Sequence, residues 1–359
     1  MAKQRIVSAE AADPQEEAAH HSLRPSRLDD YVGQSQLVEK LRITLQAVRE
    51  RDEPMEHVLL HGPPGLGKTT LAHIIAQEMS THLVVTSGPA LGRPTDLVGT
   101  LTRLQRGDVL FIDEIHRLSP VVEEYLYPAM EDFKIDVTVD QGMHARSITL
   151  PLKPFTLIGA TTRAGLLSAP MRSRFGITHS LQFYDDEQLL AILHRSARLL
   201  ELTDAHAGAQ RSEAPDDLEA ALTRIAARSR GTPRIANRLL RRVRDYAQVK
   251  AKGRINADSV DAALKLEGVD ALGLDDLDRK YMHVIGTVYE GGPVGLEAVA
   301  ATMGEDAGTL EDVVEPYLLQ IGYLARTRRG RQLTRAGAEH VGLKIKTTDN
   351  GDAEESLFE

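Results

Sequence analysis

The stretch that decides the fold is His57-Val58-Leu59-Leu60-His61-Gly62-Pro63-Pro64-Gly65-Leu66-Gly67-Lys68-Thr69. Its beginning predicts a buried β-strand, and from Gly62 onward it matches the pattern G-x-x-x-x-G-K-[ST] without substitution. Glycines let the backbone curl, so that N–H groups and the start of the next helix point at phosphate oxygens. Lys68 adds a positive charge at the β- and γ-phosphates, and Thr69 a hydroxyl ligand for Mg²⁺. Because the order is strand, loop, helix, a nucleoside triphosphate site is favoured over an ordinary glycine-rich turn.

Outward from this stretch, short apolar runs alternate with helical stretches. The runs that are typical of strands cover residues 57–61, 82–86, 109–112 and 155–159. Near-continuous apolar strands between helices indicate a parallel sheet that is buried on both faces. The predicted fold class for this part of the chain is therefore α/β.

Two carboxylates, Asp113 and Glu114, follow the apolar run 109–112. An acid at this place in a P-loop protein can hold Mg²⁺, and its neighbour can polarise the attacking water. Adjacent acids also occur in solvated turns, but the intact phosphate-binding loop upstream favours the catalytic interpretation. The pair predicts hydrolysis of the nucleotide, with Thr69 and Asp113 as metal ligands.

Further candidate catalytic residues follow the run 155–159. Thr162 can hold the attacking water with its hydroxyl, although a simple strand-end turn is an alternative. Arg172 and Arg174 come shortly after it. An arginine offered to the γ-phosphate of a neighbouring subunit neutralises transition-state charge, and Arg174 is the better candidate, with a surface salt bridge as the alternative. Such an arginine makes oligomerisation part of the mechanism.

The segment Gly231-Thr232-Pro233-Arg234 opens an arginine-rich helix. Proline suits the first turn of a helix, which fixes Arg234 near the helix entry. From there, Arg234 can reach the phosphates and report the nucleotide state. Most of the later arginines are interpreted as a solvated or ion-paired face.

The chain of 359 residues is too long for one ordinary core. We predict a large α/β domain over 21–184, a small all-helical domain over 185–255 and a winged helix over 256–345, flanked by acidic, disordered tails at 1–20 and 346–359. Within the large domain, alternating apolar residues between Phe133 and Leu150 predict an inserted β-hairpin, with a turn at Gln141-Gly142. Its apolar face packs on its own core or binds a partner.

Composition excludes several classes of protein. Zero cysteines rule out disulfides, thiolate metal sites and cysteine nucleophiles. We expect neither a membrane span nor a signal peptide, because no apolar run is long enough and the N-terminal residues are acidic; the expected location is cytoplasmic. The net charge of −9 argues against indiscriminate coating of nucleic acid.

One segment is nevertheless strongly basic, because residues 323–346 carry seven lysines and arginines and a single acid, Glu339. Arginines around a hairpin turn can contact phosphates or enter a minor groove without reading base sequence. That property suits a protein that must pass along any sequence. A solvated basic hairpin is the alternative.

Four of these motifs together resemble the bacterial RuvB family of AAA+ ATPases, and the likeness runs over residues 23–343. The motifs are Gly62–Thr70, Leu110–Leu118, Gly159–Arg163 and Gly231–Arg238. The resemblance implies a P-loop AAA+ ATPase domain, a helical lid and a winged helix. It implies a motor of Holliday junction branch migration in recombination, DNA repair and the SOS response, which uses ATP and Mg²⁺. It further implies a hexameric ring on duplex DNA at four-way junctions, with RuvA docked on hairpin 133–150 and RuvC as a second partner.

The resemblance also assigns residues. Arg174 becomes the arginine finger, Thr162 the first sensor and Arg234 the second, while Arg326 and Arg331 match DNA contacts. The catalytic set is then Lys68, Asp113, Glu114, Thr162 and Arg174. The residues expected around the nucleotide are Leu23, Arg24, Tyr31, Val32, Gly62, Gly65, Leu66, Gly67, Lys68, Thr69, Thr70, Glu131, Asp132, Phe133, Arg174, Tyr184, Pro233 and Arg234.

A competing interpretation keeps the ATPase and changes its task. In a clamp-loader-like or protein-remodelling ATPase, the winged helix would bind proteins; the four-motif match favours the junction motor. One segment departs from the family pattern, since the connection over 201–217 is longer and richer in Ala and Gly. Surface loops tolerate such growth, so we expect no effect on the chemistry.

Overall fold

The computed structural model describes residues 6–7, 22–138, 147–202 and 215–344. These residues divide into two compact units. The unit with the phosphate-binding loop, called the nucleotide unit, contains the described residues from 22 to 202 and the segment 231–237. The unit with the basic hairpin, called the wing unit, contains 6–7, 215–230 and 238–344.

The nucleotide unit is built on a five-stranded parallel sheet with the strand order β2-β3-β6-β1-β7. The strands are β1 (Val58–His61), β2 (Leu83–Ser87), β3 (Val109–Asp113), β6 (Thr156–Thr161) and β7 (Ile177–Ser180). Every residue of β6 is buried, as are the apolar residues of β1 and β3. The predicted parallel α/β sheet is confirmed. The edge strand β7 was not predicted, because Ile-Thr-His-Ser contains no apolar run.

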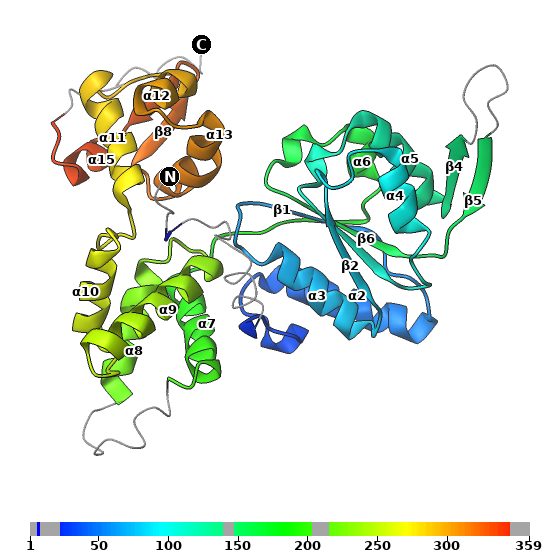
Figure 1. The fold of residues 1–359 in the computed structure, drawn as a ribbon, viewed down its shortest axis with the longest axis horizontal. Coiled ribbons are helices and arrows are strands. Elements are labelled where there is room, and N and C mark those ends of the chain that lie inside the picture. Colours follow the sequence, from blue (N-terminus) through cyan, green and yellow to red (C-terminus); the bar gives the residue numbers. More distant parts are fainter. Residues whose placement is uncertain (1–5, 8–21, 139–146, 203–214, 345–359) are drawn as a thin grey trace, which may run out of the picture. The chain divides into compact units, whose positions relative to one another are not determined.

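Helices cover both faces of this sheet. In Figure 1, α2 (Ser35–Arg51) and α3 (Lys68–Glu78) lie on one side, and α4 (Pro94–Leu101), α5 (Pro120–Glu131) and α6 (Ala169–Ser173) on the other. Leu110, Ile112 and Leu157 of the sheet share one core with Leu97 and Leu126 of the helices. The short turns η1 (Leu28–Asp30), η2 (Ile115–Arg117) and η3 (Ala164–Leu166) complete the unit. This packing fixes the strand ends, where the candidate site residues lie.

The inserted hairpin consists of β4 (Lys134–Thr138) and β5 (Ser147–Pro151), paired antiparallel. Its predicted turn at Gln141-Gly142 falls outside the described residues. Ile135 is buried in the core of the unit, whereas Ile148 is 47% exposed. The apolar face is therefore divided between the protein's own core and an outward-facing part.

Four helices follow the sheet domain: α7 (Asp186–Leu199), α8 (Pro215–Ala227), α9 (Pro233–Lys250) and α10 (Ala257–Leu266). The predicted helical lid is confirmed, and its predicted range, 185–255, contains the first three of these helices. In the wing unit α10 packs on α8, although the predicted boundary at residue 256 assigned this helix to the winged helix. The middle of the connection 201–217 lies outside the described residues.

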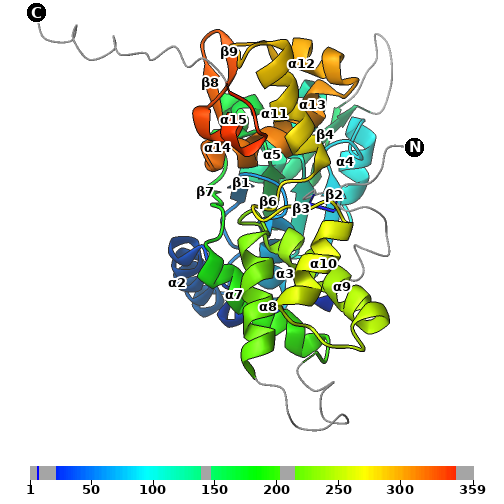
Figure 2. The ribbon, with the colours of Figure 1, turned by 90° about the vertical axis from the view of Figure 1, so that its left-hand side faces the viewer.

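The winged helix contains α11 (Asp276–Val288), α12 (Leu296–Met303), α13 (Ala307–Thr309), the π-helical turn η4 (Leu310–Val314), α14 (Glu315–Gln320) and α15 (Arg335–His340). Its wing is the antiparallel hairpin β8 (Leu324–Thr327) and β9 (Gly330–Leu333), which Figure 2 shows beside α15. Tyr281, Leu318 and Leu333 belong to its core. The predicted winged helix is confirmed. None of the described helices is both long and apolar enough to cross a membrane.

Candidate functional site

The phosphate-binding loop connects the end of β1 to the start of α3, and two of its glycines are required by the space around them. Gly62 has φ +130°, and a Cβ there would lie 2.7 Å from the carbonyl oxygen of Leu181. Gly67 has φ +101°, and a Cβ there would lie 2.9 Å from the hydroxyl of Tyr31. The loop therefore follows a path that other residues cannot adopt, and it leads into the N-terminus of an 11-residue helix, where N–H groups favour anions.

Lys68 lies at the centre of this loop and is only 8% exposed. Its Nζ donates hydrogen bonds of 2.8 Å to the carbonyl oxygens of Gly62 and Pro63. Burial lowers the pKa of Lys68 to about 8, and the charge of Asp113 partly opposes that shift. The two carbonyl groups are neutral, so the buried charge of Lys68 is not cancelled by them. Lys68 is therefore suited to bind an anion such as a phosphate.

Asp113 is the last residue of β3, and Glu114 follows it directly. Burial raises the pKa of Asp113, while the backbone N–H of Glu114 and the charge of Lys68 act against it. The N–H of Glu114 donates to Asp113 Oδ1 over 2.9 Å. Glu114 itself has φ +46°, which is strained for a residue with a side chain, and its carboxylate pairs with Arg117 Nη1 at 2.7 Å. Strain of this kind concentrates at functional sites, and Arg117 is a contact that the sequence did not reveal.

The end of β6 lies next to the phosphate-binding loop, because Gly62 donates its N–H to the carbonyl oxygen of Thr161 over 3.2 Å. Thr162, the predicted sensor, is half-buried immediately after this strand. The buried Thr161 hydroxyl lies 2.8 Å from His116 Nδ1 and accepts the N–H of Arg163. His116 lies within the motif Leu110–Leu118, and its contact with Thr161 joins the turn after β3 to the end of β6.

The residues predicted to surround the base also come together beside the loop. The hydroxyl of Tyr184 lies 2.9 Å from that of Tyr31 and 3.2 Å from the carbonyl oxygen of Leu66. Burial raises the pKa of Tyr31 and raises that of Tyr184 to about 12, so both remain neutral donors at physiological pH. Tyr184 also donates its N–H to the carbonyl oxygen of Gly231 over 2.9 Å.

The remaining predicted residues belong to two further segments, one near Leu23 and one at the start of α9. Arg195 donates to the carbonyl oxygens of Leu23 and Arg24 at 2.6 and 3.1 Å, which holds the segment that leads to Val32. Pro233 opens α9, and the charge of Arg234 is one of the smaller effects that oppose the burial-induced rise in the pKa of Asp113. Arg195 has no motif signature, because it acts on backbone more than 170 residues away.

These residues fit a nucleoside triphosphate with Mg²⁺. The glycine curl, the helix N-terminus and Lys68 are donors for phosphates, and Thr69 and Asp113 are oxygen ligands of the kind that Mg²⁺ prefers. Among the described residues, no group of three or more His, Cys, Asp or Glu could hold a metal ion by itself. Thr69 and Asp113 therefore match the way in which Mg²⁺ usually binds, through one or two protein ligands together with phosphates of the substrate.

A second group of predicted residues lies at the amino ends of the parallel strands, whereas the phosphate-binding loop lies at their carboxyl ends. The ring centroid of Phe133 is 6.5 Å from that of His57, which precedes β1, whereas the phosphate-binding loop follows β1. An extended strand separates His57 from Gly62 by about 16 Å. Arg174 contacts Glu131 at 3.1 Å and lies 4.2 Å over the ring of Tyr127. Asp132 pairs with Lys134. Glu131, Asp132, Phe133 and Arg174 are thus brought together, but not with the phosphate-binding loop of the same chain.

The predicted DNA contacts form a third group, on the wing. Arg326 and Arg331 face each other across β8 and β9, and both bind the fully buried carboxylate of Glu315. Arg326 Nε and Arg331 Nε each donate to it over 2.8 Å, and the Tyr281 hydroxyl donates over 2.6 Å. These three hydrogen bonds hold the pKa of Glu315 below its usual value against the effect of burial. Glu315 is another residue that no sequence pattern indicated, since its partners come from separate elements.

Comparison with known proteins assigns all three parts of the chain. The Holliday junction DNA helicase RuvB P-loop domain matches residues 23–181, the RuvB AAA lid domain 184–270 and the RuvB C-terminal winged helix domain 271–342. A solved structure of the Thermotoga maritima RuvB Holliday junction branch migration motor is 49% identical, covers 90% of this chain and 100% of its own, and has a TM-score of 0.79. Two variants of Thermotoga maritima RuvB, one with alanine changed to serine and one with lysine changed to arginine, are 49% identical over 90% of this chain and 99% of theirs, with TM-scores of 0.80.

Proposed function

The chain belongs to the RuvB family of P-loop AAA+ ATPases, and on that premise we propose that it is an ATP-driven motor which moves four-way DNA junctions as a ring of identical subunits. The observation that carries the proposal is the division of the catalytic residues. Lys68, Asp113 and Glu114 lie at the carboxyl ends of the parallel strands and Arg174 at their amino ends. One chain therefore supplies half of each site, and the hexamer implied by the family would complete six.

Each half has a distinct task in hydrolysis. Lys68 binds the β- and γ-phosphates, Thr162 holds the attacking water, and Glu114 polarises it. Arg174 of the adjacent copy reaches the γ-phosphate and offsets the charge that develops there, while Arg234 responds to the nucleotide. Mg²⁺ bound by Thr69 and Asp113 would neutralise phosphate charge. Glu131, Asp132 and Phe133 then border the nucleotide of the neighbouring copy and not that of their own.

DNA and protein partners occupy other surfaces in this proposal. Arg326 and Arg331 present a pre-arranged pair of guanidinium groups to phosphates without reading base sequence. The outward-facing Ile148 offers an apolar contact for RuvA on the hairpin β4–β5. RuvC is a further partner implied by the family. Branch migration of chromosomal DNA junctions fits a cytoplasmic location.

A strand-dissociation assay on a synthetic four-way junction tests the proposal. We expect ATP-dependent conversion of the junction to duplex products, stimulated by the RuvA partner, and no conversion with ADP. A protein that hydrolyses ATP, yet leaves junctions intact with and without RuvA, would refute the motor. Activity on clamp-loading substrates in the same preparation would assign the ATPase to the competing class.

A further inference from the structure

The turn between α8 and α9 is shared by the two compact units. Arg230 belongs to the wing unit, and the next residues, Gly231–Asn237, belong to the nucleotide unit. The carbonyl of Gly231 accepts the N–H of Tyr184, and the Asn237 side chain accepts the Ser196 hydroxyl at 2.6 Å. The segment that carries Arg234 is thus held by hydrogen bonds from Tyr184 and Ser196. It follows Arg230 directly in the chain.

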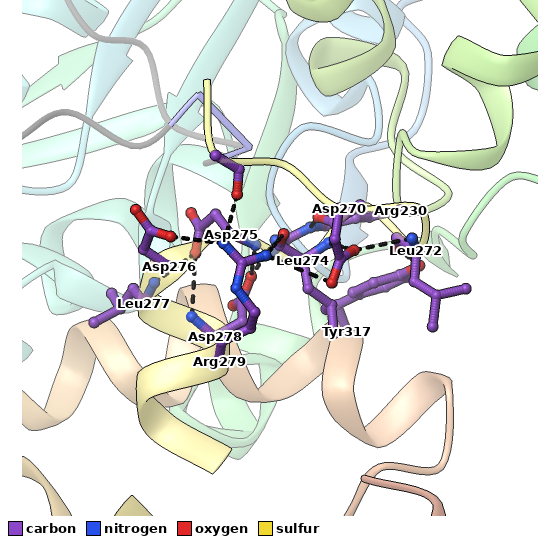
Figure 3. Close-up of polar contacts among 12 residues, drawn as sticks. Arg230, Asp270, Leu272, Leu274, Asp275, Asp276, Leu277, Asp278, Arg279 and Tyr317 are labelled. Atoms are coloured by element: carbon purple, nitrogen blue, oxygen red, sulfur yellow. Dashed lines mark hydrogen bonds and ion pairs between the residues drawn. The ribbon is translucent and has the colours of Figure 1, made fainter. Parts of the chain in front are cut away.

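Arg230 fastens the other side of this turn to the winged helix, as Figure 3 shows. Its side chain is 3% exposed and forms an ion pair with Asp278, which is fully buried. Its Nε donates to the carbonyl oxygen of Gly273 over 2.6 Å, and its guanidinium lies 5.2 Å from the ring centroid of Tyr317. A Cβ on Gly273 would lie 2.4 Å from the carbonyl oxygen of Arg228, so the two backbones are in direct contact. The turn and the start of α11 therefore pack as one piece.

The same contacts continue to the wing. Asp278 lies in the first turn of α11, and Tyr281 follows one turn later with its hydroxyl on Glu315. Tyr317, which faces Arg230, lies two residues after Glu315 on α14. Arg230 thus contacts both helices that position Glu315, and Glu315 binds Arg326 and Arg331. Buried polar groups connect the turn to the predicted DNA-contacting arginines.

We propose that Arg230 is a positioning residue that couples nucleotide state to DNA binding by the wing. When the nucleotide moves the segment 231–237, α11 and α14 move with it. The reason is that separating the buried pair Arg230–Asp278 would leave an unpaired charge in the protein interior, which is strongly unfavourable. An exposed pair in the same unit, Arg224–Asp261, has no such effect, since water screens it. The coupling rests on the proposed function, as it assumes that the wing binds DNA.

The test compares full-length variants on plain duplex DNA. Arg230→Met combined with Asp278→Asn removes both charges of the ion pair, and Asn can still accept the N–H of Asp275. We measure duplex Kd with a non-hydrolysable ATP analogue and with ADP, DNA-free ATP hydrolysis, and junctions dissociated per ATP. In the wild type the two Kd values should differ by about tenfold or more, a typical allosteric coupling. In the double variant their ratio should fall to about one, with DNA-free hydrolysis within about twofold of wild type. Arg224→Met should retain the wild-type ratio.

Thermal unfolding accompanies each variant. If the double variant does not fold, Arg230→Lys replaces it: the charge remains, but the planar fork over Gly273 and Tyr317 is lost, so an intermediate Kd ratio is expected. A folded double variant that keeps the wild-type ratio of the two duplex Kd values would overturn the coupling. A wild-type protein whose duplex Kd is the same with the ATP analogue and with ADP would also overturn it. The motor and the coupling fail separately, because junction activity of the wild type tests the first and the duplex Kd ratio tests the second.

Discussion

Lys68 and Asp113 are charges of opposite sign in the same crevice, each withdrawn from water. Burial lowers the pKa of the lysine to about 8 and raises that of the aspartate, and each charge moderates the shift of the other. The protonated lysine is therefore poorly solvated in the folded protein. The proposed role of Lys68, which requires its protonated form, therefore predicts that ATP binding depends on pH near 8.

We expect ATP affinity to weaken above pH 8, because binding then requires Lys68 to take up a proton; Kd should rise by up to about tenfold per pH unit. Folding responds with the opposite sign. The unfolded lysine, with a pKa near 10.5, binds more protons between pH 8 and 10.5, so the ligand-free protein gains stability as pH rises through that window. Titration with a fluorescent ATP analogue at several pH values measures the affinity. Lys68→Ala should bind weakly with no such slope; an unchanged slope would assign it to another group.

Glu114→Gln should retain ATP binding and lose at least about 100-fold in turnover, since the amide cannot polarise water as a carboxylate does. Arg117, which pairs with Glu114 at 2.7 Å, supplies a companion variant. Arg117→Ala should leave binding unchanged and alter kcat by freeing the carboxylate. Phosphate release and nucleotide binding, measured side by side, separate the two effects. Hydrolysis by Glu114→Gln at the wild-type rate would remove the role of this residue.

Residues that act on their sequence neighbours could be predicted, and residues that act across the fold could not. Lys68, Asp113 and Glu114 stand in local patterns whose chemistry is independent of the rest of the chain. Arg195, Tyr127 and Glu315 meet their partners only after elements distant in sequence have packed, and no spacing rule connects them. The roles given to the individual site residues remain predictions.

At the scale of the element, the loop between β1 and α3 depends on backbone conformations that only glycine adopts readily. Gly67→Ala combines φ +101° with a contact of 2.9 Å to the Tyr31 hydroxyl. We expect a loss of about 1–3 kcal/mol of stability and at least about tenfold in ATP affinity. Gly99→Ala is the matched control, because Gly99 lies within α4 with nothing inside 4 Å of an added Cβ; it should be neutral or stabilising. Equal behaviour of the two variants in thermal unfolding and nucleotide titration would contradict the strain argument.

The hairpin β4–β5 was predicted from its alternating pattern, but the pattern left open whether its apolar face met its own core or a partner. The structure shows one residue of each kind, the buried Ile135 and the exposed Ile148. Periodicity identifies a face, whereas only the packed fold shows how much of that face is covered.

Ile148→Glu should weaken RuvA binding by about tenfold or more, since a charge would enter an apolar contact. ATP hydrolysis without DNA should be unaffected, as the side chain is exposed. Thr149→Glu, on the adjacent exposed position, is the matched control and should change binding less. Binding can be followed by anisotropy of labelled RuvA, and undiminished affinity of Ile148→Glu would place the partner elsewhere.

For the whole molecule, the proposed function rests on one arrangement: Lys68, Asp113 and Glu114 lie at the carboxyl ends of the parallel strands, and Arg174 lies at their amino ends. A mixture of two inactive variants tests it. Glu114→Gln supplies an intact Arg174, and Arg174→Ala supplies an intact Glu114, so random assembly at equal amounts restores about a quarter of the sites. ATP hydrolysis should therefore recover on mixing. No recovery, with assembly confirmed by light scattering, would show that both residues act within one chain.

The same arrangement determines the symmetry of the contact. A two-fold contact joins the same surface patch of both copies, so a patch that contains only the Arg174 end or only the loop end would complete neither site. In the proposed ring the interface would be heterologous, joining the Arg174 end of one copy to the loop end of the next. Such an assembly has a direction. Until it closes into a ring, the copy at one terminus has an Arg174 without a neighbouring loop, and the copy at the other terminus has a loop without a neighbouring Arg174. A copy whose Arg174 surface cannot bind would consequently stop the assembly from growing at one terminus and not at the other.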